Sequence, residues 1–183
     1  MRRTLHTVFL DRDGVINEKM PEGHYVTSTA EFRLLPHVAE SIASLKQAGL
    51  RVIVVSNQRG ISKGLYSPAD VDAIHAAFRS RLETHGTRVD GFYYCPHDKD
   101  QCNCRKPLPG LFEQAVADFP DIVAATSAMV GDSLSDIEFG RGLGMQTVFV
   151  EGDPERRKPG GEKAGEMADM RVASLAEAAK ALL

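Results

Sequence analysis

The 183-residue sequence lacks several features that would assign it to a common class of protein. Its longest uninterrupted apolar runs have the length of a strand, far short of the ~20 residues that a membrane-spanning helix needs. Asp11 follows Arg3 too soon to leave room for the apolar core of a signal peptide, so the first residues do not resemble one, and we expect a cytoplasmic protein. Lys and Arg total 22 against 25 Asp and Glu, whereas nucleic-acid-binding proteins usually have a basic excess. We therefore expect neither a membrane nor a nucleic acid as a partner.

The remaining composition is that of an ordinary globular protein, with 43% apolar and 26% charged residues. Apolar, β-branched segments alternate with helical patterns, which is typical of a parallel sheet covered by helices. We predict one domain over residues 1–183, a Rossmann-like three-layer α/β sandwich. Residues 151–165, rich in Gly, Pro and charge, are predicted to form a mobile surface loop before a terminal helix. The strands are expected at 6–10, 51–55, 91–94, 127–130 and 146–150.

Polar side chains follow the predicted strands at their carboxyl ends. Asp11 and Asp13 follow the first strand, Ser56 follows the second, and Asp132 and Asp136 follow the fourth. Ligands of open α/β sheets bind outside this edge, so these residues are expected to share one crevice. A single aspartate at such a position can simply cap a turn or a helix, but the whole set at matching strand ends favours a site.

Several carboxylates in one crevice repel one another unless a cation lies among them, and oxygen ligands suit Mg²⁺. Mg²⁺ beside a carboxylate indicates phosphoryl chemistry. In such a site Asp11 can attack phosphorus, while Asp13 acts as general acid and then as general base. A calcium loop of the EF-hand type is excluded, because Ile16 takes the place of its glycine and no helix precedes Asp11.

The three cysteines all lie within residues 95–104, in a polar segment. Without an export signal, such a cluster favours a metal over a disulfide. Three thiols and one imidazole are enough for a closed, structural zinc site, and the zinc would order the loop. Incidental cysteines are the alternative, and the absence of a Cys-x-x-Cys pattern argues against a redox role. The predicted ligands are Cys95, His97, Cys102 and Cys104.

Three segments resemble the motifs of one known superfamily. Residues 9–17 (FLDRDGVIN), 55–58 (VSNQ) and 130–136 (VGDSLSD) are similar to motifs I, II and IV of the haloacid dehalogenase (HAD) phosphatases. The resemblance implies that Asp11 forms a phosphoaspartyl intermediate and that Asp13 is the acid/base. It implies Mg²⁺ bound by Asp11, the Asp13 main-chain carbonyl and Asp132, with Asp136 a weaker or indirect ligand. Ser56 and the Asn57 amide would then hold the phosphoryl oxygens, and Gln58 would also contact substrate.

The cysteine segment, with Arg105-Lys106-Pro107 directly after it, resembles a zinc-containing HAD subgroup. That subgroup includes heptose 1,7-bisphosphate phosphatases and histidinol-phosphate phosphatases. Lys106 would be the motif III lysine and Arg105 a contact of a substrate phosphate. Ser133 stands where members of the heptose group often have lysine. His24 and Tyr25, in a loop after motif I, match a substrate-contacting stretch only loosely.

The short spacing between motifs I and II leaves no room for a large cap domain. The resemblance implies removal of the 7-phosphate from D-glycero-D-manno-heptose 1,7-bisphosphate, a step towards surface polysaccharide. The alternatives are a phosphatase of histidinol phosphate or of another small metabolite, and a non-enzymatic zinc-loop module. We expect a monomer. The histidines of the second helical pattern, His75 and His85, are expected at the surface.

Overall fold

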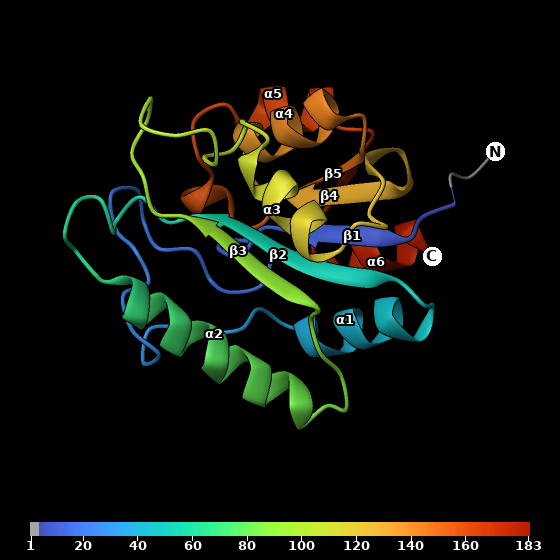
Figure 1. Cartoon of the computed structure of the whole chain (residues 1–183), viewed down its shortest axis with the longest axis horizontal. Helices are drawn as coiled ribbons and strands as arrows, with labels where there is room; N and C mark the ends of the chain where they lie inside the picture. Colours follow the sequence, from blue (N-terminus) through green and yellow to red (C-terminus); the bar gives the residue numbers. More distant parts are fainter. Residues whose placement is uncertain (1–3) are drawn as a thin grey trace.

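Six parallel strands form the centre of the computed structural model, which describes residues 4–183. Their order in the sheet is β3-β2-β1-β4-β5-β6, so β1 lies between β2 and β4. Every residue of β1 is buried. Figure 1 shows the strands running together through the middle of the molecule. Their bounds are β1 Thr7–Leu10, β2 Arg51–Asn57, β3 Gly91–Cys95, β4 Ser127–Gly131, β5 Gln146–Val150 and β6 Met170–Val172.

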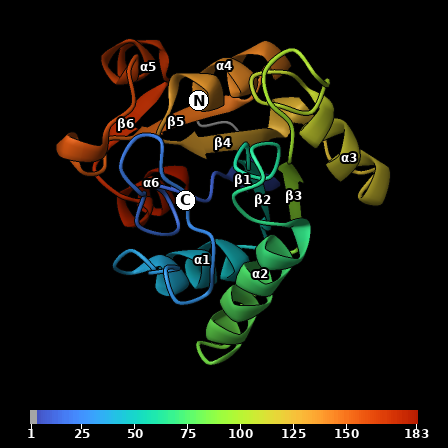
Figure 2. The same ribbon diagram turned by 90° about the vertical axis from the view of Figure 1, so that its left-hand side faces the viewer.

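Helices cover both faces of the sheet, as Figures 1 and 2 show. The side chains of a strand alternate between the faces, so Val8 and Leu10 join one apolar cluster and Phe9 joins the other. On the Val8 face lie α1 (Val38–Gln47), α2 (Pro68–Glu83) and α6 (Leu175–Leu182). On the opposite face lie α3 (Gly110–Asp118), α4 (Leu134–Leu143) and α5 (Gly161–Met167). The predicted three-layer sandwich without a large cap is confirmed.

Local sequence signals place the helix ends. Ser67 and Asp70 form a capping box at the start of α2, with Pro68 in the first turn. Gly144 ends α4 with a positive φ of 79°. Two short 3₁₀ helices, Ala124–Thr126 and Pro154–Arg156, complete the regular structure. Among the described residues no helix is both long and apolar enough to cross a membrane.

The structure differs from the sequence prediction in three places. A sixth strand, β6, lies where the start of the terminal helix was expected. Helix α5 begins inside the predicted loop 151–165, because Gly161 and Ala164 are small enough to be buried against the strands. His75 was expected at the surface but is 4% exposed, with its ring stacked on Phe92 at 4.5 Å between centroids. An imidazole can pack like an apolar ring, so its polarity was a poor guide.

Candidate active site and metal centres

Asp11 and Asp132 lie together at the carboxyl edge of the sheet because their strands are neighbours. Leu10 of β1 pairs with Val130 of β4, so the residues that follow the two strands emerge side by side. Asp11 N also donates to Val130 O at 2.9 Å. Gly14 has a φ of 92°, and a Cβ there would lie 2.1 Å from Asp132 Oδ2. The turn after β1 therefore needs glycine to pass so close to the second carboxylate.

Lys106 is the buried cation of this acidic group. Its Nζ donates to Asp11 Oδ1 at 2.9 Å, Asp136 Oδ1 at 2.6 Å and Val55 O at 2.8 Å. An ammonium carries three protons, so each has an acceptor. The side chain is only 1% exposed, and a buried charge is tolerated when it is paired and fully hydrogen-bonded. Lys106 thus ties the end of β1 to the first turn of α4.

The side chain of Asn57 holds the main chain of Lys106. Asn57 Nδ2 donates to Lys106 O at 3.1 Å, and Asn57 Oδ1 accepts from Lys106 N at 2.9 Å. Ser56, the residue before it, is 1% exposed, and its Oγ accepts from Gln58 Nε2 at 3.2 Å. The end of β2 therefore fixes the position of Lys106, which lies far along the sequence.

Asp136 is held at both carboxylate oxygens. Ser133 Oγ and Ser133 N both donate to Asp136 Oδ2, at 2.6 and 3.1 Å, in the capping box of α4. Lys106 occupies Oδ1. Burial acts to raise the pKa of Asp136, but the Lys106 cation and the hydrogen bonds outweigh it and leave that pKa below its usual range. Asp136 is thus placed to orient Lys106, and Ser133 serves as a helix cap.

Burial and the neighbouring charges shift the pKa values of this group. Burial raises the pKa of Asp11 to about 7, the Asp136 carboxylate adds to the increase, and the Lys106 ammonium opposes it. Burial also raises the pKa of Asp132, against the charge of Lys19. Burial disfavours the charge of Lys106, but Asp11 and Asp136 outweigh this and raise its pKa. A further cation would favour the ionised carboxylates.

The carboxylates have the donor set of a magnesium site. One oxygen from each of Asp11, Asp132 and Asp136 lies within 4.8 Å of the others, and all three residues are buried. Asp132 Oδ1 is buried and has no hydrogen-bond partner among the described residues. Native proteins seldom leave a buried polar atom without a partner. Carboxylate oxygens are the ligands that Mg²⁺ prefers. The residues therefore fit a divalent cation between Asp11 and Asp132.

Two lysines that the sequence analysis did not single out act on the same carboxylates. Lys19 forms an ion pair with Asp132 Oδ2, and its side chain is 10% exposed. Lys158, from the predicted mobile loop, acts by its charge to lower the pKa values of Asp11, Asp132 and Asp136. Both lysines lie in irregular segments. Such segments have no sequence periodicity from which their position at the edge of the sheet could be predicted.

Asp13 lies beside this group and is held by three donors. Its Oδ1 accepts from Asn17 Nδ2 at 2.9 Å and from Arg12 NH2 at 3.1 Å. Its Oδ2 accepts from Gln58 Nε2 at 3.1 Å. Burial acts to raise the pKa of Asp13, but the Arg12 charge and the hydrogen bonds outweigh it and leave the pKa below its usual range. The side chain is 26% exposed against 9% for Asp11, so Asp13 is a fixed carboxylate nearer the solvent.

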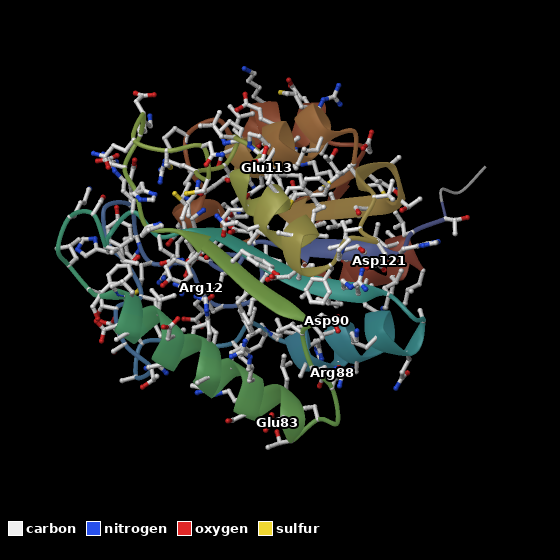
Figure 3. All side chains as sticks on the ribbon, viewed as in Figure 1. Arg12, Glu83, Arg88, Asp90, Glu113 and Asp121 are labelled. Atoms are coloured by element: carbon white, nitrogen blue, oxygen red, sulfur yellow. The ribbon has the colours of Figure 1, made fainter. Side chains whose placement is uncertain are left out.

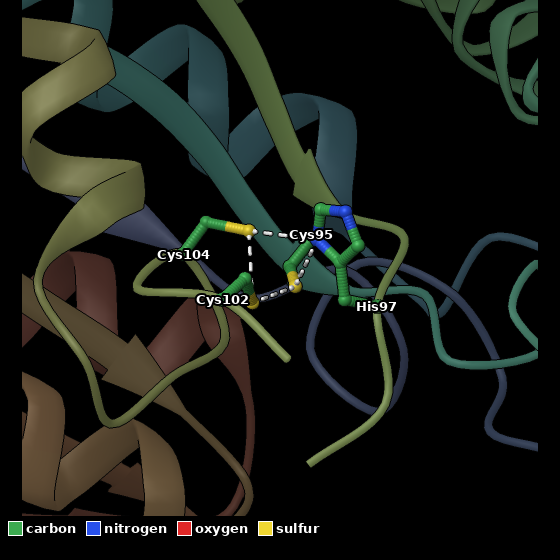
Figure 4. Close-up of side chains that lie close together, drawn as sticks. All are labelled: Cys95, His97, Cys102 and Cys104. Atoms are coloured by element: carbon green, nitrogen blue, oxygen red, sulfur yellow. Dashed lines mark hydrogen bonds between the residues drawn. The ribbon is translucent and has the colours of Figure 1, made fainter. Parts of the chain in front are cut away.

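Four side chains, that of Cys95 at the end of β3 and three from the loop that follows, point towards a common centre (Figure 4). Cys102 Sγ lies 3.5 Å from Cys95 Sγ and 3.4 Å from Cys104 Sγ. His97 Nδ1 lies 3.4 Å from Cys104 Sγ and 3.8 Å from Cys95 Sγ. Tetrahedral zinc with Zn–S bonds of about 2.3 Å would separate its ligands by about 3.8 Å. The four side chains therefore fit a zinc ion with no open position.

The other residues predicted to bind substrate make contacts away from the carboxylates. Arg105 donates from NH1 to the main-chain oxygen of His97 at 3.4 Å, so it is directed towards the cysteine loop. His24 is exposed. Tyr25 is half-buried, with its ring 5.9 Å from that of Tyr66.

A pocket of about 240 Å³ opens beside Asp132. It lies between the chain after β1 and the segment after β5, and Arg156 NH1 closes one side by donating to Lys19 O at 2.5 Å. Its lining includes acidic side chains, such as Glu18 and Asp153, as well as basic ones. A small polar molecule with several hydrogen-bonding groups would find partners of both kinds there.

Comparisons with known proteins show the family to which the chain belongs. A family profile described as HAD-hydrolase-like matches residues 103–178. The D-glycero-alpha-D-manno-heptose-1,7-bisphosphate 7-phosphatase of Mycobacterium tuberculosis is 39% identical over 176 residues, which cover 96% of this chain and 90% of that one. The corresponding beta-heptose phosphatase of Pseudomonas aeruginosa is 39% identical over 152 residues, covering 82% and 83% of the two chains.

A solved structure supports the same family. The D,D-heptose 1,7-bisphosphate phosphatase of B. bronchiseptica, crystallised with magnesium and phosphate, has a TM-score of 0.85 at 34% identity. The match covers 97% of this chain and 98% of that one. Fold and carboxylate site together define a HAD-like hydrolase. With relatives this similar over nearly the whole length, the chain belongs to the HAD family of heptose-bisphosphate phosphatases. It is a phosphatase, as the sequence resemblance implied.

Proposed function

We propose that Asp11 is the nucleophile of a two-step hydrolysis of phosphomonoesters. An Asp11 carboxylate oxygen attacks phosphorus, the bond to the leaving oxygen breaks, and Asp13 protonates that oxygen. Asp13 then takes a proton from water, whose oxygen attacks phosphorus. The bond from phosphorus to Asp11 breaks, and inorganic phosphate leaves. The observation that carries this proposal is the pairing of buried Asp11 with Lys106 beside Asp13, whose carboxylate three donors hold.

The Lys106 ammonium favours the ionised form of Asp11, which is the form that attacks phosphorus. Its ammonium neutralises the Asp11 carboxylate, so a negatively charged phosphoryl group can approach with less repulsion. We propose that Ser56 and the main-chain amide of Asn57 hold phosphoryl oxygens, since both lie at the end of β2 next to Lys106. Arg105 is proposed as a contact of a substrate phosphate.

Asp11, Asp132 and the Asp13 main-chain carbonyl are the proposed ligands of Mg²⁺. When bound, the ion supplies positive charge that offsets the phosphoryl oxygens and the attacking carboxylate. Support comes from the unpartnered Asp132 Oδ1 and from the magnesium in the similar B. bronchiseptica enzyme. Lys19 occupies the other Asp132 oxygen and competes for the same carboxylate. Asp136 is proposed to act indirectly, through Lys106.

The cysteine loop is proposed to bind structural zinc through Cys95, His97, Cys102 and Cys104. Because these residues fill all four positions, no place remains for water or substrate. The zinc would fix the loop at the end of β3, and Lys106 follows Cys104 by two residues. The zinc therefore supports catalysis by holding the chain that carries the lysine.

The proposed substrate is D-glycero-D-manno-heptose 1,7-bisphosphate, hydrolysed at the 7-phosphate. The relatives named for this reaction match most of the chain, and they include enzymes of the alpha and the beta anomer. Without a large cap, recognition depends on loops, and the polar pocket beside Asp132 suits a sugar with many hydroxyls.

The test is kcat/KM for phosphate release with Mg²⁺ from both heptose anomers and from histidinol phosphate. We expect a preference for a heptose bisphosphate of about 100-fold or more, equivalent to about 3 kcal/mol in transition-state binding. A preference for histidinol phosphate would overturn the substrate and leave the carboxylate chemistry in place. No phosphate release from any small ester, by folded and metal-loaded protein, would overturn the proposed function.

A further inference from the structure

Gln58, whose position in the VSNQ segment predicted a substrate contact, is held by other protein groups in this structure. The residue is 2% exposed, and both ends of its side-chain amide are satisfied by protein. Oε1 accepts from Tyr66 Oη at 2.6 Å and from Arg12 NH2 at 3.3 Å. Nε2 donates to Asp13 Oδ2 at 3.1 Å and to Ser56 Oγ at 3.2 Å. An amide has two protons and two acceptor positions, so this one is saturated.

The donors around Oε1 determine which way the amide points. Arg12 can only donate, so it requires the oxygen of Gln58 on its side. In this arrangement Asp13 Oδ2 accepts a hydrogen bond, so it requires the nitrogen of Gln58 on the other side. Figure 3 shows Arg12 at the end of the sheet, on the side of α2. The Tyr66 hydroxyl makes the shortest of the four contacts and adds a second donor to the oxygen.

Tyr66 is built into this position by its surroundings. The residue is 7% exposed, and its ring lies against Gly60, where a Cβ would be 2.1 Å from Tyr66 Cε1. Leu65 N donates to Gly60 O at 3.0 Å, which closes the turn that presents the ring. On another side the ring of Tyr25 lies 5.9 Å away at 51°. Burial raises the pKa of Tyr66, so its hydroxyl keeps the proton it donates.

We propose that Tyr66 is a positioning residue for Asp13 and acts through the Gln58 amide. Tyr66 holds Gln58 so that Nε2 fixes Asp13 Oδ2, while Arg12 and Asn17 fix Oδ1. This inference rests on the proposed role of Asp13 as general acid. It assigns to the loop after β2 a function in proton delivery, in addition to the ring contact it makes with Tyr25.

The proposal predicts a dependence on the leaving group. An alkoxide of a sugar leaves slowly unless an acid protonates it, whereas p-nitrophenolate leaves without that help. The value of kcat/KM includes only steps up to departure of the leaving group, so it isolates this proton transfer. Misplacing Asp13 should therefore lower kcat/KM for heptose 1,7-bisphosphate and spare kcat/KM for p-nitrophenyl phosphate.

The experiment compares Tyr66→Phe with Tyr93→Phe, which removes a hydroxyl that donates to Asp118 on the surface. Tyr66→Phe should lower kcat/KM for the heptose ester by about tenfold and for the aryl ester by less than about twofold. Tyr93→Phe should change neither. Equal losses on both esters, or no loss on either, would overturn the proposal.

Two further variants keep the result decisive. Gln58→Met removes the amide with little change of shape, and should give a loss at least as selective as that of Tyr66→Phe even if the latter folds poorly. Adding Tyr66→Phe to Gln58→Met should cause no further loss, and an additive loss would contradict action through Gln58.

Asp13→Asn tests the role on which the inference rests. If Asp13→Asn lowers kcat/KM equally for both esters, the assignment of Asp13 as general acid is wrong. If Asp13→Asn is selective for the heptose ester but Tyr66→Phe lowers kcat/KM equally for both, the positioning role of Tyr66 is wrong.

Discussion

The two candidate metal sites of this molecule are assembled in opposite ways. The acidic site takes Asp11 from the end of β1 and Asp132 from the end of β4, so it exists only once those distant strands have paired. The cysteine site takes all four side chains from residues 95–104. The acidic site owes its geometry to two distant strands, whereas the cysteine site takes Cys95 from the end of β3 and its other three side chains from the loop that follows, which the proposed zinc would order.

The two sites are joined through one short stretch of chain. Cys104 belongs to the cysteine site, and Lys106 reaches the acidic site. Asn57 clamps the main chain of Lys106 from the end of β2. Lys106 is therefore anchored twice, by the sheet and by the loop, and variants of the two sites should differ in what they disturb.

The largest effect is expected for Lys106→Met, which removes the cation that the two buried carboxylates share. Leaving Asp11 and Asp136 without it should abolish turnover and lower the free energy of unfolding by about 3 kcal/mol. Urea unfolding and kcat measure the two effects. The control is Lys46→Met, which breaks the pair with Asp90 near the protein surface and should cost about 1 kcal/mol or less. Equal losses of stability would show that Lys106 is no more important than a peripheral lysine.

An intermediate effect is expected for Cys102→Ser. Loss of one thiolate should remove zinc and loosen the chain before Lys106, lowering kcat by about tenfold while the acidic site keeps its affinity for magnesium. Metal content and kcat are measured together, with Gln101→Ser in the same loop as the control. Full zinc content with an unchanged rate would remove Cys102 from the ligand set.

The smallest effect is expected for Lys19→Ala. Because the Lys19 ammonium occupies Asp132 Oδ2, its removal should strengthen binding of Mg²⁺, or of Mn²⁺ as a probe, by a few-fold. Titration calorimetry of protein that keeps its zinc but is freed of magnesium measures this change, with Lys63→Ala as the control. Weaker binding by Lys19→Ala would mean that Lys19 supports the metal site rather than competing for it.

The same contrast explains what could be predicted from the sequence. The strand pattern and the rule that parallel strands end at one edge were enough to bring Asp11 and Asp132 together, and adjacency alone predicted the cysteine site. The buried position of Gln58 could not be foreseen, because it depends on Tyr66 in an irregular turn. Lys19 was missed because it also lies in an irregular segment, where no sequence pattern indicates the position of a side chain. Strand β6 was missed because its three residues give too short a pattern to detect.

The most direct test of the proposed chemistry is to trap the phosphorylated enzyme. Protein mixed with labelled heptose 1,7-bisphosphate and Mg²⁺ is quenched in acid within the first turnover, and the labelled peptide is identified by mass spectrometry. We predict phosphate on Asp11, and neither label nor turnover in a folded Asp11→Asn variant. Label on another residue, or turnover by Asp11→Asn close to that of the unaltered enzyme, would contradict the assignment of Asp11 as the nucleophile.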